Sequence, residues 1–593
     1  MGKFLVRLFA VIGVVAVLVL AGIIVLGSVL IDRLGAPEPP ARFVLDLDLR
    51  QGAPDAAPPG PLARRLTDAP ATLGEVVRAL DLAAVDDRVV AVAARFGPDT
   101  FGPAVAQELR QAVERYRESG KPAIAHADSF GELSPGNWSY LTASAFDEVR
   151  LQPGGGVGLT GVISEQPFAD ALLTDLGIET PVFRHGEYKT APNAVTEASM
   201  PPAQREMLES LVGDLADQLV AGIAESRGLD RQAVIDLMNQ GPLLAGQALE
   251  GGLIDGLGHW RDLRAELREA DEPGDEGSET GILDVADYLG AADGAPVEPA
   301  GRFALVWANG MIVEGESEAP GFGPGPTLMG ADTVSRAITD AVDDDRYDAI
   351  VLRIDSGGGS AVASEVIRDA VRYAREAEKP LIVSMGGAAA SGGYWIAADA
   401  QEIVANPGTL TGSIGVFAGK PVLEDLWDDL GVEWDRVAVG RNAGMFSINQ
   451  PYSPAARARI EAAIDAIYGQ FLEVVAEGRG MEVERVREIA EGRVWTGAQA
   501  LEIGLVDRLG GLGTATLAAA EAVGLAPDAP IWLEPVPPQR GPLEDLLDLT
   551  SSVLAGAQSA SALARLTTLA EEAAPLLSPA VGGPARMPET GLR

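Results

Sequence analysis

The same pattern of residues occurs twice in this chain, and this duplication constrains the fold more than any other feature. Recurring positions keep one register; Gly161 and Gly415, for example, differ by 254 residues (415 − 161). Further along, a Gln-Ala-Leu-Glu segment recurs at an offset of 252 (499 − 247). Chance does not hold a register over such a distance, so we predict two homologous domains, 42–265 and 302–522. The recurring residues are Glu148, Pro153, Gly154, Gly161, Gly177, Glu179, Gly186 and Gln247 in the first copy, and Glu402, Pro407, Gly408, Gly415, Gly431, Glu433, Gly440 and Gln499 in the second.

Each copy alternates segments typical of strands with segments typical of helices. In the second copy, 349–383 runs from a short apolar segment through a stretch of helical composition to a second apolar segment. This order predicts a mainly parallel sheet surrounded by helices, and so an α/β fold in each copy. Ser453 followed by Pro454 is a typical helix start, and Pro202 begins the matching helix of the first copy.

The N-terminus predicts a membrane anchor. Residues 8–31 carry no charge and are long enough to span a bilayer core of roughly 30 Å. Lys3 and Arg7 precede this run, so we expect segment 1–33 to have a cytoplasmic N-terminus and a single transmembrane helix, with the body outside. A cleaved signal peptide is the alternative, although its apolar region is normally about 7–15 residues long.

Two further segments lie outside the copies. Residues 266–301 are rich in Glu, Asp, Gly and Pro, and we predict a linker there. Residues 523–593 become rich in Ala, Leu, Ser and Pro. We expect them to form a partly disordered C-terminal extension with a helix at 543–572.

The charge balance and the absence of cysteine exclude several kinds of site. The net charge is −41, whereas a nucleic-acid surface needs clustered Lys and Arg. We interpret the charge as a solvated acidic exterior. The chain has no cysteine, which excludes disulfides, thiolate zinc sites and a cysteine nucleophile.

Two glycine-rich segments of the second copy follow predicted strands, at 355–360 and 386–393. Glycines after a strand let backbone N–H groups approach an anion. Neither segment has the Lys of a phosphate-binding loop or the GxGxxG spacing of a dinucleotide site. An oxyanion hole remains, with one N–H from the first loop and one beside a nucleophile.

Ser391 is the candidate nucleophile. At the repeat offset it pairs with Asn137, and the first copy carries Gly97-Pro98-Asp99-Thr100 where the second has its glycine-rich loop. Only the second copy therefore keeps a serine beside an oxyanion-type loop. The alternative is that Ser391 is simply the N-cap of a helix, a frequent role of serine.

Lys189 is the candidate base. The chain has only five lysines against forty arginines, and the repeat partner of Lys189 is Ala443. Arginine cannot replace a lysine base, because it stays protonated. Burial lowers a lysine pKa from about 10.4 towards about 7–8, where it can accept a serine proton. Two alternatives stay open: Lys189 could form a surface ion pair with Glu187, or a histidine could be the base. The histidines are His126, His185 and His259, and no motif surrounds them.

These residues together resemble signal peptide peptidase A in its long, two-domain bacterial form. The most specific segments are Leu352-Arg353-Ile354-Asp355-Ser356, Ala390-Ser391-Gly392-Gly393-Tyr394-Trp395, 405–415 (ANPGTLTGSIG) and Gly186-Glu187-Tyr188-Lys189-Thr190-Ala191. The resemblance extends from the anchor to about residue 522. One departure is Ser356-Gly357-Gly358-Gly359, because the family usually has Ser-Pro-Gly-Gly there. The extra glycine removes a φ constraint from the loop but removes no donor.

The resemblance implies a fold like those of Clp protease and crotonase in each copy. It implies Ser391 as nucleophile, Lys189 as general base, Ser413 as the residue that orients the lysine, and the N–H groups of Gly359 and Gly392 as the oxyanion hole. It also implies a homotetramer in the bacterial inner membrane that faces the periplasm and degrades signal-peptide remnants and other apolar peptides. No metal or cofactor is expected.

Two other functions remain as alternatives. A crotonase-like acyl-thioester enzyme also uses paired N–H groups, but it would bind a CoA-type nucleotide, and the acidic, outward-facing chain argues against that. A catalytically inactive membrane scaffold would keep the fold without the chemistry.

Overall fold

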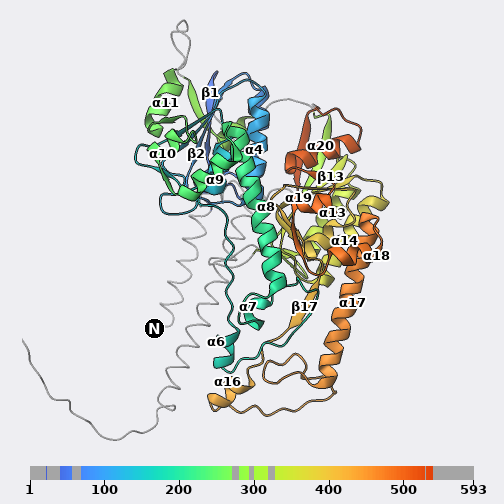
Figure 1. Cartoon of the computed structure of the whole chain (residues 1–593). Helices are drawn as coiled ribbons and strands as arrows, with labels where there is room; N and C mark the ends of the chain where they lie inside the picture. The colour runs from blue at the N-terminus through green and yellow to red at the C-terminus, as the bar shows by residue number, and fades with distance from the viewer. Residues whose placement is uncertain are drawn as a thin grey trace, which may run out of the picture. The chain divides into compact units, whose positions relative to one another are not determined.

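The computed structural model describes residues 40–56, 69–269, 280–292, 299–317, 327–527 and 529–537, together with the isolated Gly22 (Figure 1). All the strands with described bounds lie in one compact unit, 27–319 and 326–539. The predicted anchor at 1–33 and the predicted helix at 543–572 lie outside the described residues. Within the described part of the chain, no helix is both long and apolar enough to cross a membrane.

The first copy contains a six-stranded, parallel sheet in the order β8-β4-β3-β2-β1-β9. Its strands alternate with helices along the chain, as the sequence predicts. The strands are β1 (Phe43–Asp48), β2 (Val89–Phe96), β3 (Ala123–Ala127), β4 (Glu148–Leu151), β8 (Gly256–Leu257) and β9 (Gly281–Asp284). The helices are α3 (Leu73–Val85), α4 (Pro103–Arg117), α5 (Asn137–Ala143), α6 (Asp170–Asp175), α7 (Asn193–Thr196), α8 (Pro202–Arg227), α9 (Arg231–Gln240), α10 (Ala245–Glu250), α11 (Trp260–Glu269) and α12 (Val285–Ala292).

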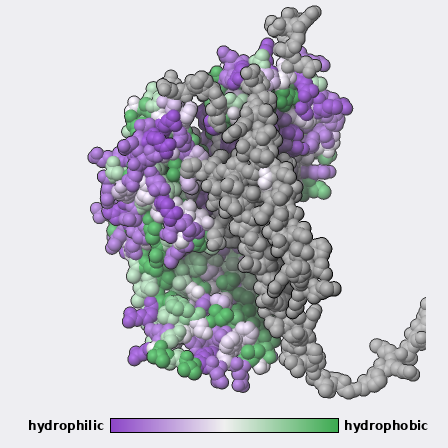
Figure 2. Space-filling view, turned by 180° about the vertical axis from the view of Figure 1, so that it is seen from behind, coloured by the Kyte–Doolittle hydropathy of each residue, from purple (hydrophilic) through white to green (hydrophobic). Residues whose placement is uncertain are grey.

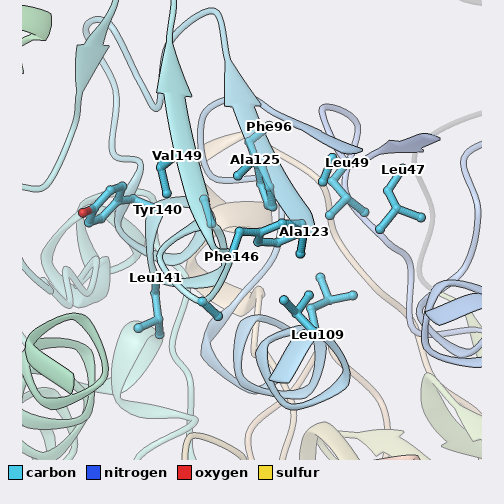
Figure 3. Packing of buried hydrophobic residues seen from close by; sticks show 14 of the residues in the cluster. Leu47, Leu49, Phe96, Leu109, Ala123, Ala125, Tyr140, Leu141, Phe146 and Val149 are labelled. Carbon is cyan, nitrogen blue, oxygen red and sulfur yellow. The ribbon is translucent and has the colours of Figure 1, made fainter. Parts of the chain in front are cut away.

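The core of the first copy lies between this sheet and its helices. Figure 3 shows Leu47 and Phe96 from the strands packed in one cluster with Leu109 of α4 and Leu141 of α5. Each of these four side chains is almost fully buried. Burial of this apolar surface is the main stabilising contribution to such a layer.

The second copy repeats this arrangement in a larger sheet, ordered β18-β16-β14-β13-β10-β20, with β15 paired to β14 and β19 paired to β15. Every pair in it is parallel except β16 with β18. The parallel α/β architecture predicted from the sequence is therefore confirmed in both copies. The strands are β10 (Gly301–Asn309), β13 (Ala349–Ser356), β14 (Leu381–Ala390), β15 (Glu402–Ala405), β16 (Leu410–Gly412), β18 (Val494–Thr496), β19 (Arg508–Leu509) and β20 (Ile531–Val536). The helices are α13 (Ala331–Asp343), α14 (Ala361–Glu376), α15 (Gly392–Ala397), α16 (Glu424–Asp429), α17 (Pro454–Arg479), α18 (Val483–Ile489), α19 (Gly497–Glu502) and α20 (Leu512–Ala522).

The two long helices, α8 and α17, begin where the sequence predicts and end alike. Each has 26 residues and begins at a proline, and the Ser453 hydroxyl accepts the Ala456 N–H at the start of α17. Gly228 and Gly480 end them in the same left-handed conformation. Glycine is favoured at such a C-terminus because it has no Cβ to strain a positive φ.

Part of the predicted linker and part of the predicted C-terminal extension belong to the sheets. Strand β9, from within 266–301, pairs with β1, and β20, from within 523–593, pairs with β10. Each strand therefore extends its sheet in the equivalent place. The composition of these regions did not indicate β9 and β20, because both strands are short apolar segments flanked in the sequence by polar or proline-rich residues.

Several contacts join the copies within this unit, and a strand pair and a buried charge cluster are among them. Strand β6 (Val182–His185) of the first copy pairs antiparallel with β17 (Val416–Gly419) of the second. The fully buried guanidinium of Arg353, on β13, binds the carboxylates of Asp55 and Glu108 from the first copy. A buried charge is tolerated only with such partners, so this cluster specifies how the two copies pack. The remaining pairs of short strands are β5 (Gly156–Val157) with β7 (Leu243–Leu244), and β11 (Met311–Val313) with β12 (Leu328–Gly330).

Candidate active site

Ser391 lies between β14 and α15 in a strained backbone conformation, with φ 55° and ψ −119°. A positive φ is rare for a residue with a side chain and costs about 1–3 kcal/mol. Ser391 occupies the N-cap position of α15, yet its side chain makes no capping hydrogen bond there. Its Oγ instead accepts a hydrogen bond from Lys189 Nζ at 2.9 Å. The capping role that the sequence left open is therefore not what this hydroxyl does.

Lys189 is buried, with 4% of its surface exposed. Its Nζ donates to Ser391 Oγ, to the Ser413 carbonyl at 2.9 Å and to Ser413 Oγ at 3.0 Å. Burial lowers the pKa of Lys189 to about 8, because the charged ammonium loses its hydration. A surface ion pair between Lys189 and Glu187, the alternative left open by spacing, is not formed.

Ser413 holds Lys189 through both its carbonyl and its hydroxyl. Its own φ is 51°, and its N–H donates to the Arg493 carbonyl at 2.7 Å. Ser391 and Ser413 thus both accept a hydrogen bond from Lys189 Nζ, and both have a positive φ. The family resemblance implied that Ser413 orients the lysine, but nothing in the sequence analysis indicated this positive φ.

The two glycine-rich loops lie in close contact. A Cβ added at Gly358 would lie 2.7 Å from Gly392 N and 2.8 Å from Ser391 Cβ. One added at Gly392 would lie 3.2 Å from Gly359 N. Gly392 is also the first residue of α15, where an amide has no partner within the helix. These contacts bring the first loop against the backbone of Ser391 and Gly392, with Gly359 N close to Gly392.

Ser356 determines the shape of the first loop. Its hydroxyl accepts the Gly358 N–H at 3.1 Å and donates to the Gly310 carbonyl at 2.6 Å. A Cβ at Gly357 would meet nothing within 4 Å, so space does not require a glycine there. The loop is thus held by this hydroxyl, and no proline restricts φ at position 357.

In the first copy, the side chains at the positions that match Ser391 and the glycine-rich loop are engaged in hydrogen bonds with the backbone. Asn137 is 4% exposed, and its side chain accepts the N–H groups of Thr160 and Gly161 and donates to the Gly161 carbonyl. Asp99 accepts the N–H groups of Trp138 and Ser139. These groups are satisfied among themselves, which agrees with the view that the first copy has no nucleophile of its own.

Among the described hydrogen bonds, none joins a histidine to Ser391. His126 is buried and bonds the Gly258 carbonyl, and burial lowers its pKa. His185 stacks on Tyr468 and bonds Asp465. Within the part of the chain that the structure describes, no cluster of three or more His, Asp or Glu side chains could hold a metal ion.

Comparison with known proteins gives the family. The model of peptidase family S49 matches 115–272 and 373–526, together more than half of the chain, with one segment in each copy. The chain is 36% identical to Protease 4 of Salmonella typhi over 70% of this chain and 66% of that protein. It is 30% identical to Protease 4 of Haemophilus influenzae, over 71% of this chain and 68% of that one, and 28% identical to the chloroplastic serine protease SPPA of Arabidopsis thaliana, over 80% and 69%. The match to the Salmonella protein thus covers just under two thirds of its length.

Two solved structures are also similar to parts of the chain. A mutant of ClpP1 from Listeria monocytogenes has 17% identity and a TM-score of 0.22, covering 35% of this chain and 90% of its own. A mutant of the membrane-bound stomatin-specific protease 1510-N has 18% identity and a TM-score of 0.24, covering 37% and 84%. Scores this low carry no argument, so the likeness of each copy to Clp protease and crotonase stays a prediction. The family match decides the assignment: the chain belongs to peptidase family S49 and resembles serine proteases over most of its length.

Proposed function

We propose that this chain is a serine endopeptidase that works with a Ser–Lys dyad, with Ser391 as nucleophile and Lys189 as general base. The observation that carries the proposal is the 2.9 Å hydrogen bond between Lys189 Nζ and Ser391 Oγ in a buried site. A candidate base must lie within about 2.6–3.2 Å of the proton it takes. A lysine pKa of about 8 leaves a usable fraction of neutral amine near neutral pH.

The reaction is acyl transfer. Neutral Lys189 takes the Ser391 proton while Oγ attacks the peptide carbonyl, and the N–H groups of Gly359 and Gly392 stabilise the oxyanion. The lysine then gives its proton to the leaving amine, and an acyl-enzyme remains. In the second half, Lys189 activates water to hydrolyse this ester. Ser413 accepts hydrogen bonds from Lys189 Nζ, which keeps Nζ directed at Oγ.

A serine-directed probe tests the proposed chemistry. A fluorophosphonate is expected to react with the folded protein at one residue, and mass mapping should find the adduct on Ser391. The heat-denatured protein is the control and should not react, since its serine has lost its base. A folded protein that stays unlabelled would favour the scaffold, and binding of a CoA thioester without labelling would favour the crotonase-like enzyme.

The proposed substrates are signal-peptide remnants and other extended, apolar peptides. The support is the resemblance to signal peptide peptidase A, together with the predicted anchor that would hold the site near a membrane. In a competition between a synthetic signal peptide and a polar peptide of equal length, we expect faster cleavage of the former.

We propose that the protein is a single-pass protein of the bacterial inner membrane. The support is the uncharged run 8–31 with Lys3 and Arg7 before it. Protease added from the periplasmic side is expected to digest the body and to leave an N-terminal tag protected. Recovery of a mature form that begins near Ala36 would show cleavage and contradict the anchor.

A homo-oligomer, by resemblance a homotetramer, is the proposed assembly. Supporting this, apolar side chains are exposed in the segment after α16, and Figure 2 shows hydrophobic residues at the surface in the lower part of the molecule. Large exposed apolar patches are rare on soluble monomeric proteins and mark sites of interaction with another protein or a membrane. Light scattering of the detergent-solubilised protein measures the assembly directly. The exposed residues are Leu430, Val432, Trp434, Val437, Val439, Phe446 and Ile448.

A further inference from the structure

A short turn at 490–493, between α18 and β18, contacts the segments that carry both Lys189 and Ser413. Two consecutive residues in it, Glu491 and Gly492, have positive φ, 49° and 76°. The turn is closed by a hydrogen bond from Arg493 N–H to the Ala490 carbonyl at 2.8 Å. It belongs to the second copy, whereas Lys189 belongs to the first.

Main-chain groups of this turn bind both segments. The Glu491 carbonyl accepts the Tyr188 N–H at 2.8 Å, on the residue just before Lys189. The Arg493 carbonyl accepts the Ser413 N–H at 2.7 Å, and Gly492 N–H donates to the carbonyl that follows Ser413 in the chain, at 2.9 Å. The turn therefore connects the backbone next to Lys189 with the backbone of Ser413, the residue that binds Lys189 Nζ.

Gly492 brings the two backbones closer than any side chain would allow. A Cβ added there would lie 2.5 Å from Lys189 N and 2.6 Å from both Lys189 Cα and Cβ. Glycines on both sides meet the same turn: a Cβ at Gly186 would lie 2.3 Å from the Glu491 carbonyl, and one at Gly415 would lie 2.8 Å from Gly492 Cα. These contacts are with backbone atoms and with Lys189 Cβ, none of which can swing away as the end of a side chain can.

An ion pair between Arg493 of the turn and Glu206 of α8 also holds the turn in place. The Arg493 guanidinium donates two hydrogen bonds to the Glu206 carboxylate of α8, at 2.6 and 3.0 Å. It also lies over the rings of Tyr188 and Trp495, with its carbon 4.9 and 4.5 Å from their centroids. Bidentate pairs of this kind constrain geometry as well as distance. The turn is thus attached to the first copy by side chains as well as by its backbone.

We propose that the turn at 490–493 is a positioning element for the lysine, and that Gly492 is its critical positioning residue. The proposal rests on the Ser–Lys mechanism above. In it, the second copy determines how far Nζ of Lys189, which belongs to the first copy, lies from Ser391 Oγ. Gly492 makes no hydrogen bond to Ser391; it acts through the backbone of Lys189 and, by its N–H, through the backbone that follows Ser413. A shift of Lys189 by about 1 Å is enough to cost roughly 100-fold in rate.

Gly492→Ala tests this inference, with Gly524→Ala as the matched control. Both glycines have φ 76°, but a Cβ at Gly524 meets nothing within 4 Å, so the control carries the backbone strain without the contact. In Gly492→Ala we expect kcat to fall about 100-fold with little change in KM. The midpoint of the pH–rate profile should rise towards the ordinary lysine value of about 10.4, as Nζ loses its buried position. Gly524→Ala should match the wild type in all three quantities.

A second variant covers the outcome in which Gly492→Ala does not fold. Glu206→Gln keeps the shape of the side chain and weakens its contact with Arg493. We expect kcat to fall about threefold to tenfold with KM unchanged, because a loosened turn misplaces Lys189 less than a clash does. If folded Gly492→Ala, or in its absence Glu206→Gln, has the kcat and pH midpoint of Gly524→Ala, the inference is overturned. Lys189→Ala, measured alongside, separates failure of the dyad from failure of the further inference. Full activity in Lys189→Ala would overturn the dyad. An inactive Lys189→Ala together with an unaffected Gly492→Ala would overturn only the role of the turn.

Discussion

Replacing Ser391 by Ala is expected to lower kcat for peptide hydrolysis by at least about 10⁴-fold, because no other group on β14 or α15 replaces the attacking Oγ. The free energy of unfolding should change little, since the Ser391 side chain makes no capping hydrogen bond and Lys189 Nζ keeps both of its hydrogen bonds to Ser413 when Oγ is removed. Steady-state hydrolysis of a fluorogenic apolar peptide and a denaturant titration measure the two quantities.

Ser453→Ala is the matched control for this experiment. Ser453 is a capping serine of the same copy, with its Oγ accepting the Ala456 N–H at 3.1 Å. Its loss should cost about 0.5–2 kcal/mol of stability and leave hydrolysis unchanged. The two variants are therefore expected to show opposite patterns. Substantial turnover by Ser391→Ala would rule out the serine mechanism.

Lys189→Arg is expected to be as inactive as Lys189→Ala, although it keeps the positive charge. A guanidinium stays protonated throughout the usable pH range and cannot accept the serine proton. In the wild type, the neutral amine is the active form. Activity should therefore be low well below pH 8, rise as the pH passes the lowered pKa of Lys189 at about 8, and level off above it. The pH dependence of kcat/KM from pH 5 to 10 measures this midpoint.

Lys121→Arg serves as the control for the lysine variants. Lys121 lies in the same copy, and its Nζ donates to the main-chain carbonyls of Ala83 and Asp86. An arginine can make such contacts, so activity and pH midpoint should stay at the wild-type values. Activity in Lys189→Arg comparable to that of Lys121→Arg would exclude a lysine base, and His126, His185 and His259 would have to be reconsidered.

Lys121 and Lys379 stand in matching Lys-Pro segments of the two copies, and they illustrate how much of the fold follows from the sequence. Both precede a proline and a strand, and in the structure each Nζ donates to two carbonyls at the C-terminal end of an earlier helix. These are Ala83 and Asp86 at the end of α3 in one copy, and Ala341 and Asp344 at the end of α13 in the other. Local patterns of this kind predicted the parallel sheets and the start of α17. They missed β9 and β20, because each is a short strand whose partner lies far away in the chain.

For the candidate site, too, some features follow from the sequence and others only from the tertiary structure. The sequence by itself determined that there are two α/β copies, that only the second keeps a serine beside a glycine-rich loop, and that Lys189 has no counterpart in the other copy. Only the tertiary structure decided that Lys189 and Ser391, 202 residues apart, form a hydrogen bond. That contact depends on the pairing of β6 with β17, on the buried Arg353 cluster and on the turn that holds Gly492 against Lys189. None of these has a periodicity or a local propensity, because each is a contact between surfaces that exist only once both copies have folded.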